Sequence, residues 1–365
     1  MQRQFKEKDG RLDSKIVREL GPHIMSALFD PEITEIMVNS DGKIWFERRE
    51  VKTNEYDDDD DDDESEEYVA ECDNTEENEV NDEEQQDGKK YGMYDSGHTI
   101  KAQYLLTALG SIASDNGKEI NEKNPILSAV LKISGSRVLG IVPPASPNGP
   151  SITIRKHSSA VIPLRQYIKQ GRVPKAQADF LRECIKTKKN IIVAGGTKSG
   201  KTTFVNALIK ETVKLTPKDR IIIMEDTYEI QCGAENKERL VTLDGVITMQ
   251  ELVKASLRMR PDRIIVGEVR GKESLDLLKA LNTGHPGGFA TLHCNDAVSS
   301  LTRLESLNME AEGQNPQCKL IGDAVDVVAY MEKTDKTGAQ LAQVIRVNNY
   351  KGGEYNYETL YNIKE

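Results

Sequence analysis

A glycine-rich turn between two regular segments constrains this chain more than any other feature of its sequence. Residues 190–194 form an apolar run typical of a short buried strand, and residues 201–214 carry apolar side chains at helical spacing. The turn that joins them directs backbone N–H groups and a helix N-terminus toward one point, which is the arrangement that binds a polyphosphate. Strand, glycine-rich turn and helix in this order predict the phosphate-binding loop (P-loop) of a nucleotide-binding domain.

The residues predicted to bind the nucleotide are Gly195, Gly196, Thr197, Lys198, Ser199, Gly200, Lys201, Thr202 and Thr203. Among them, Lys201 is expected to reach the β- and γ-phosphates, and the Thr202 hydroxyl is expected to bind Mg²⁺. ATP and Mg²⁺ are therefore the expected cofactors. The alternative for this segment is a turn and helix that hold no ligand.

Hydrolysis of a nucleotide also needs a carboxylate that orients or polarises the attacking water. The apolar strand 263–267 is followed directly by Glu268, our candidate for that role. A second strand, 220–225, ends in Glu225 and Asp226, which are expected to order water around Mg²⁺ or to contact the nucleotide. Open α/β sheets bind their ligands at the carboxyl ends of strands, so these acids are expected to lie beside the P-loop.

Histidines and arginines supply further candidates. His293, at the end of an apolar strand 290–292, is the stronger histidine candidate for a hydrogen bond to the γ-phosphate, and His285 is the weaker one. Metal ligation by the two is not expected, because no third ligand has suitable spacing. Arginines that could neutralise phosphate charge, in the same chain or across a subunit boundary, are Arg137, Arg155, Arg258, Arg260 and Arg270. For each arginine alone, a surface or ion-pair role is the plainer interpretation.

An acidic segment dominates the charge of the chain. Residues 55–87 contain 20 Asp and Glu and no Lys or Arg, so a net charge of −11 becomes +9 once they are set aside. A block of like charges with little apolar content cannot bury enough surface to fold. We interpret residues 53–92 as a disordered acidic insert, either a tolerated surface loop or a competitor for basic surfaces. The basic remainder permits contact with nucleic acid or anionic lipid without establishing it.

Patterning divides the rest of the chain into an α+β domain at 1–155, a linker at 156–175 and an α/β domain at 176–365. In the first domain we expect a helix interrupted near Gly21 and a hairpin, 33–38 with 43–47. In the second, strands alternate with helices. A capping box of Thr248 and Glu251 is expected to begin one helix, and two late strands are expected at 323–331 and 340–347.

Cysteine usage and hydropathy bear on location. The five cysteines are scattered and lack C-x-x-C spacing, which favours reduced thiols in the cytoplasm over a disulfide framework or a zinc site. No apolar run approaches 18 residues, and the first residues lack the apolar stretch of a signal peptide. We therefore expect a cytoplasmic chain, with peripheral attachment to the inner face of the membrane left open.

Five segments together resemble a known family, the secretion traffic ATPases, which are the hexameric motors of type II and type IV secretion, conjugation and pilus assembly. These segments are 195–203, 225–227, 257–263, 267–271 and 282–293. Within the family, His-Pro-Gly-Gly at 285–288 and Ala-Thr-Leu-His-x-Asn at 290–295 are most similar to the conjugal-transfer members. The similarity is specific in 190–305 and diffuse in the first domain.

The resemblance implies an α+β N-terminal domain followed by a RecA-like P-loop ATPase domain, with six chains in a ring. It assigns the P-loop roles to Lys201 and Thr202, the Walker B role to Glu268 and the His-box role to His293. Glu225 and Asp226 match the family's Asp box, and Arg137 and Arg155 match arginines that the first domain contributes. Implied partners are other copies of the chain and a membrane-embedded secretion or conjugation complex.

Two departures from the family pattern stand out. Lys198 occupies a position where most members have glycine, so a left-handed backbone there would carry a steric cost of about 1–2 kcal/mol. We expect nucleotide binding to survive this change and turnover to be affected. The acidic segment 53–92 is the second departure, because family members have a short connection there.

The leading interpretation is a hexameric ATPase that powers conjugal DNA transfer or type IV secretion. A type IV or Tad-type pilus assembly ATPase of the same superfamily is an alternative, and a nucleotide-binding regulator with little turnover is another. A DNA-translocating helicase is disfavoured, because no basic patch with interspersed aromatic residues is present, and we expect no stable nucleic-acid binding.

Overall fold

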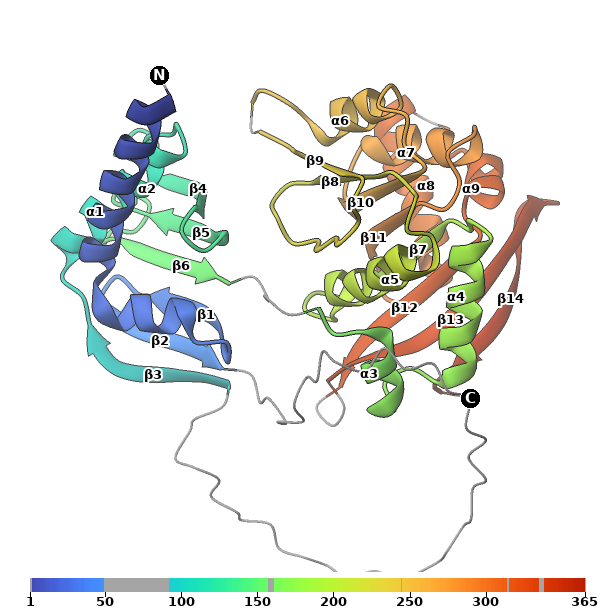
Figure 1. Ribbon diagram of the computed structural model, residues 1–365, viewed down its shortest axis with the longest axis horizontal. Helices are drawn as coiled ribbons and strands as arrows, with labels where there is room; N and C mark the ends of the chain where they lie inside the picture. Colours follow the sequence, from blue (N-terminus) through green and yellow to red (C-terminus); the bar gives the residue numbers. More distant parts are fainter. Residues whose placement is uncertain are drawn as a thin grey trace, which may run out of the picture. The chain divides into compact units, whose positions relative to one another are not determined.

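The computed structural model describes residues 2–48, 92–156, 161–243, 245–313, 315–334 and 338–364. The chain divides into two compact units, Met1–His157 and Ser158–Glu365, each of which is described by itself (Figure 1). The predicted acidic insert, 53–92, lies outside the described residues except for its last position, Gly92, which begins a strand.

The first unit joins two helices to an antiparallel sheet with the strand order β3-β2-β1-β6-β5-β4. Its elements are α1 (Gln2–Phe29), β1 (Ile33–Val38), β2 (Lys43–Arg48), β3 (Gly92–Thr99), α2 (Ala102–Asp115), β4 (Ile126–Leu131), β5 (Ser136–Ile141) and β6 (Ser151–Arg155). The predicted hairpin is confirmed, since β1 and β2 are antiparallel neighbours and Gly42 adopts a φ of 83° in the turn.

Helix α1 follows its sequence pattern closely. Ile16, Leu20, Ile24 and Leu28 are buried together with residues of α2 and of the sheet in one apolar core. The helix kinks at Gly21, with φ 76° and ψ 170°, directly before Pro22. Because proline cannot donate a backbone hydrogen bond to the preceding turn, the predicted interruption is confirmed at this point.

The second unit is built on a sheet with the strand order β14-β13-β12-β7-β11-β10-β8-β9. Its strands are β7 (Ile191–Gly195), β8 (Ile221–Glu225), β9 (Lys237–Val241), β10 (Arg263–Val269), β11 (Phe289–His293), β12 (Val327–Thr334), β13 (Gly338–Lys351) and β14 (Glu354–Asn362). Its helices are α3 (Leu164–Lys169), α4 (Lys175–Lys186), α5 (Lys201–Leu215), α6 (Met249–Ser256), α7 (Glu273–Asn282), α8 (Ser299–Glu312) and α9 (Cys318–Ala324).

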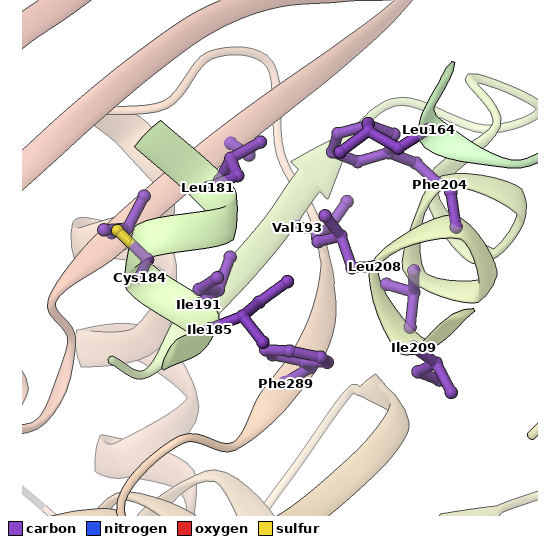
Figure 2. Close-up of a cluster of buried hydrophobic side chains, with 14 of the residues drawn as sticks. Leu164, Leu181, Cys184, Ile185, Ile191, Val193, Phe204, Leu208, Ile209 and Phe289 are labelled. Carbon is purple, nitrogen blue, oxygen red and sulfur yellow. The ribbon is translucent and has the colours of Figure 1, made fainter. Parts of the chain in front are cut away.

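The strands from β9 to β12 in this order pair in parallel, and β13 and β14 continue the sheet in antiparallel. Helices lie on both faces (Figure 1). Alternate residues of β7 serve the two faces: Ile191 and Val193 join the core beneath α3, α4 and α5, whereas Ile192 and Ala194 join the core beneath α6 to α9. Figure 2 shows the first of these cores, where Phe204 and Leu208 of α5 lie among residues of α4 and the sheet.

Two boundaries differ from the sequence-based expectation. The range 156–175, expected as a linker, contains α3, and Leu164, Tyr167 and Val173 are buried in the core of the second unit. The late strand expected from residue 323 begins at Val327, because residues 323 and 324 form the end of α9. The predicted capping box of α6 is confirmed, with Thr248 and Glu251 bonding each other's backbone N–H groups.

Within the described ranges, no helix combines the length and the apolar character that crossing a bilayer requires.

Arg263 at the start of β10 ties together the edge of the sheet at which the parallel strands begin. Its side chain has no solvent exposure, and its Nε donates to Asp219 Oδ2 at 2.7 Å. Its Nη1 donates to the carbonyl oxygen of Gly287, just before β11, at 3.1 Å, and its Nη2 to that of Ile185 in α4 at 2.8 Å. One guanidinium therefore fixes the starts of β10 and β11 against α4.

Replacement of Asp219 by alanine is expected to lower the free energy of unfolding by about 3 kcal/mol, because it leaves a buried guanidinium without its anion. Burial by itself raises the pKa of Asp219, but hydrogen bonds from Arg263 and Thr216 outweigh it and lower the pKa overall. The native protein should therefore keep this stabilisation above the carboxyl's unfolded-state pKa and lose it as the pH falls through the depressed folded-state pKa.

Urea unfolding of both proteins at neutral and acidic pH measures these effects. The control is Asp179→Ala, which removes a more exposed partner of Arg182 on α4 and is expected to cost less than about 1 kcal/mol. Equal losses in the two variants would contradict the assignment of a structural role to the buried pair.

Candidate functional site

The turn between β7 and α5 has the compact geometry that its glycines permit. A Cβ on Gly195 would lie 2.4 Å from the carbonyl oxygen of Met331 on the neighbouring strand β12. Gly200, the residue directly before α5, has φ 85°, and a Cβ there would lie 2.5 Å from the Cβ of Ala339. Both positions therefore require glycine, and the turn can lie close against β12 and β13 only because they carry it.

Lys198 is a lysine in a left-handed backbone conformation, with φ 59°. The steric cost of this conformation for a residue with a Cβ is about 1–2 kcal/mol. The side chain itself is exposed at the outside of the turn. Lysine in place of glycine at position 198 therefore carries the steric cost expected from the sequence, because φ is positive there.

Lys201 is directed back over the turn from the first residue of α5. Its side chain is nearly buried, with 8% exposure, and its Nζ donates to the carbonyl oxygens of Gly195 at 3.0 Å and Gly196 at 2.6 Å. The same Nζ lies 3.5 Å from His293 Nε2. The ammonium group thus lies at the centre of the turn and reaches the next strand of the sheet.

Parallel pairing brings the predicted carboxylate and histidine beside this lysine. His293, the last residue of β11, is the register partner of Gly195 on β7, and β10 lies on the other side of β11. Glu268 near the end of β10 has its Oε1 3.3 Å from His293 Nε2. Lys201, His293 and Glu268 are therefore linked in series across three neighbouring strand ends.

Arg270 extends this series to a fourth element. Its Nη2 donates to Glu268 Oε2 at 2.5 Å, and its Nη1 donates to Asp226 Oδ2 at 2.9 Å. Asp226 also accepts a hydrogen bond from the Thr242 hydroxyl at 3.1 Å. The guanidinium therefore joins Asp226, which directly follows β8, to Glu268 near the end of β10.

The charges within this series shift the pKa values of two members. Burial of Glu268 raises its pKa, but the hydrogen bond and charge of Arg270, with smaller contributions from His293 and Lys201, lower it overall. The pKa of His293 is lowered by burial and by the charge of Lys201, against the opposing effect of Glu268. Near neutral pH this environment favours an ionised carboxylate at Glu268 beside a neutral imidazole at His293.

Glu225 has different surroundings from those expected for a group that contacts nucleotide. It is 2% exposed, and its Oε1 accepts backbone N–H groups of Glu229 at 2.8 Å and Ile230 at 2.7 Å. Burial raises its pKa, against the lowering effect of those hydrogen bonds. Its contacts therefore make Glu225 an anchor of the loop that follows β8.

Glu229 is the functional candidate that sequence reasoning missed. Its Oε2 accepts a hydrogen bond from the Thr202 hydroxyl at 3.2 Å, so it is the acid of this loop that reaches the start of α5. The signal was present in the sequence as a third acid, four residues after Glu225. The choice among Glu225, Asp226 and Glu229 depends on the folded loop, in which Glu225 binds the backbone and Glu229 contacts Thr202.

Several predicted residues lie elsewhere. His285, Arg258 and Arg260 fall in the connections that lead into β11 and β10, at the edge where these strands begin, so they are not brought to Glu268 and His293. Arg137 and Arg155 belong to the first unit, where they are direct register partners on β5 and β6. The structure brings these two arginines together within the first unit.

Comparison with known proteins gives a consistent result. The model of the family described as "Type II/IV secretion system protein" matches residues 135–349. A probable conjugal transfer protein TrbB of Sinorhizobium fredii is 39% identical over 349 residues, which cover 96% of this chain and 94% of that protein. The conjugal transfer protein TrbB of Rhizobium radiobacter is 38% identical over 361 residues, covering 97% and 96%.

Among solved structures, the ATPase DotB of Legionella pneumophila matches with a TM-score of 0.54 and 17% identity, over 85% of this chain and 75% of that one. This likeness concerns the fold, an α+β N-terminal domain followed by a RecA-like domain. The near full-length similarity to TrbB proteins, together with the family match, settles the family. TrbB conjugal transfer proteins are similar to this chain along nearly its whole length. The chain belongs to the type II/IV secretion system protein family of secretion traffic ATPases.

Proposed function

We propose that this chain is a P-loop ATPase that hydrolyses ATP as a ring of six copies and thereby drives a conjugal DNA transfer or type IV secretion machine. The observation that carries the proposal is the series Lys201, His293 and Glu268 at adjacent strand ends, beside the glycine-rich turn between β7 and α5. The names of the relatives, conjugal transfer proteins at 38–39% identity, supply the biological process.

The residues at the start of α5 are suited to a nucleotide with Mg²⁺. Backbone N–H groups of residues 196–200 and the helix N-terminus would bind the phosphates, and the Lys201 ammonium would move from its carbonyl partners to the β- and γ-phosphates. The hydroxyl of Thr202 and the carboxylate of Glu229 are oxygen donors, the class that Mg²⁺ prefers, and these two residues would hold it. When bound, Mg²⁺ would neutralise charge that develops on the phosphates.

Glu268 is the group that would activate water. Its lowered pKa keeps it ionised near neutral pH, as a residue that orients and polarises water must be. The neutral imidazole of His293 lies between this carboxylate and Lys201, where it would hydrogen-bond the γ-phosphate. Loss of that phosphate would remove the imidazole's partner, so β11 would sense which nucleotide is bound.

The remaining parts of the proposal concern assembly and place. Arg137 and Arg155, register partners on the first unit's sheet, are proposed to contribute positive charge to a bound nucleotide, in the same chain or across a subunit boundary. The chain would act at the cytoplasmic side of a membrane-embedded complex, with peripheral attachment and without stable binding of nucleic acid. The family also contains pilus assembly ATPases, and a regulator with little turnover would have the same P-loop, so both remain alternatives.

Replacement of Glu268 by glutamine is expected to lower the rate of phosphate release by roughly 100- to 1,000-fold while ATP affinity stays within a few-fold, because the water loses its polarising anion. Replacement of Lys201 by alanine is expected to abolish measurable ATP binding, because the phosphates lose their main cationic partner. Phosphate release and nucleotide titration in magnesium buffer check both.

The matched control for Glu268→Gln is Glu358→Gln on β14, whose carboxylate pairs with Arg346 at 3.1 Å in an exposed position. It is expected to leave both measurements unchanged. Equal and negligible rates in the native protein and in Glu268→Gln would favour the regulator.

Replacement of Lys198 by glycine is expected to raise the free energy of unfolding by about 1 kcal/mol, because glycine adopts the observed φ of 59° without steric cost. Nucleotide binding should persist and turnover should rise. Chemical unfolding and phosphate release measure the two effects, and Lys198→Ala, which keeps the Cβ, separates strain from charge. Lower stability of the glycine variant would show that contacts of the lysine outweigh the strain.

Sedimentation velocity tests the ring. In the presence of Mg²⁺ and ATP, the Glu268→Gln variant, which would retain its nucleotide, is expected to form a species of six chains. A sample that stays monomeric at all nucleotide concentrations would remove the assembly from the proposal while leaving nucleotide binding intact.

A further inference from the structure

Arg270 is held by two carboxylates of the candidate site. It lies one residue beyond the end of β10, with its side chain 56% exposed, yet both of its terminal nitrogens are engaged. Nη2 bonds Glu268 at 2.5 Å and Nη1 bonds Asp226 at 2.9 Å. A planar guanidinium presents its donors in a fixed fork and so holds two carboxylates in a defined geometry, whereas the ammonium of a lysine, on a flexible stem, holds them less precisely.

The bridge divides the two oxygens of Glu268 between different partners. Oε2 is bonded by Arg270, and Oε1 is left facing His293 Nε2 at 3.3 Å. Asp226 is in turn held by the hydroxyl of Thr242 at 3.1 Å, so the far end of the bridge is fixed to the segment after β9. The rotation of the Glu268 carboxylate is therefore set by Arg270, which Asp226, in the loop after β8, holds in place.

We propose that Arg270 is a positioning residue for hydrolysis: by bridging Glu268 to Asp226 it holds one oxygen of Glu268 toward His293 and the γ-phosphate position, and does not itself bind phosphate. The inference rests on the proposed function, because it assigns a role within the same site. It gives Asp226 the role of a structural counter-ion for Arg270, in place of a direct contact with nucleotide.

Charged groups from several elements act on Glu268. Arg270 follows β10, His293 ends β11, and Lys201 begins α5. Asp226 and Glu229, in the loop after β8, act on Arg270, and Arg303 of α8 acts on His293. Of these groups, Arg270 makes the largest favourable contribution to the ionised form of Glu268, and it also opposes a positive charge on His293.

The experiment compares Arg270→Gln, Arg270→Lys and Asp226→Asn with the native chain. The control is Arg346→Gln, which removes an arginine paired with an exposed glutamate on the β13–β14 hairpin. Three quantities are measured: kcat and KM for ATP hydrolysis as a function of pH, affinity for ATP and for ADP, and the titration of His293. The last uses NMR of histidine-labelled chain without nucleotide, with the signal assigned from His293→Gln.

A positioning role predicts a specific set of results. Arg270→Gln should lower kcat roughly ten- to hundredfold at nearly unchanged KM, because a misplaced carboxylate orients water poorly. The acidic limb of its kcat profile should move to higher pH, and the pKa of His293 should rise. Arg270→Lys should recover part of kcat. Asp226→Asn should lower kcat less and should not raise the pKa of His293, because the cation stays beside it.

Two results would overturn the inference. One is a loss of ATP affinity relative to ADP in Arg270→Gln, at least tenfold and with His293 titrating as in the native chain, which would make Arg270 a phosphate ligand. The other is an Arg270→Gln variant indistinguishable from Arg346→Gln in all three measurements. The histidine titration needs no turnover, so a native chain that fails to hydrolyse ATP would defeat the proposed function and still leave the bridge open to test.

Discussion

The parallel pairing of β8, β10, β11 and β7 is the constraint on which the candidate site depends. Parallel strands end at one edge, so four residues distant in sequence become neighbours there: Asp226, Glu268, His293 and Gly195 of the glycine-rich turn. Strand pairing, and not the conformation of a long loop, places these residues together. The apolar strands, buried on both faces, fix the separation of the ends, and the side chains need only the correct rotamers to meet.

The features predicted correctly from sequence share a physical basis. The strands predicted at 190–194, 220–225 and 263–267 form at 191–195, 221–225 and 263–269, and the helix breaks at Gly21 as predicted. Each of these features is specified by local chemistry, either a continuous apolar run or a proline. Strand-end acids could likewise be assigned to one edge, because that follows from the parallel topology without knowledge of side-chain contacts. The family resemblance agreed with this assignment, and the comparisons confirm the family.

What escaped prediction depends on tertiary contacts. Nothing local distinguishes Glu225, which is buried under a loop, from Glu229, which reaches Thr202, since both are acids in the same short segment. The bridge that Arg270 makes between Asp226 and Glu268 could not be predicted from sequence, because it depends on the separation of the ends of β8 and β10. Pro163 and Gly171, which flank helix α3, predict a linker, whereas the packing of Leu164 and Tyr167 into the core stabilises a helix there. The roles in catalysis stay predictions.

The buried guanidinium of Arg263 links the packing at one end of the strands to the geometry of the candidate site at the other end. It holds the first residue of β10 against the segment just before β11, while Glu268 and His293 lie toward the opposite ends, about 17 Å along the strands. A substitution of Arg263 would let β10 shift or tilt against β11 and so displace Glu268 from His293. The variant would then lose activity although every residue of the candidate site is unchanged.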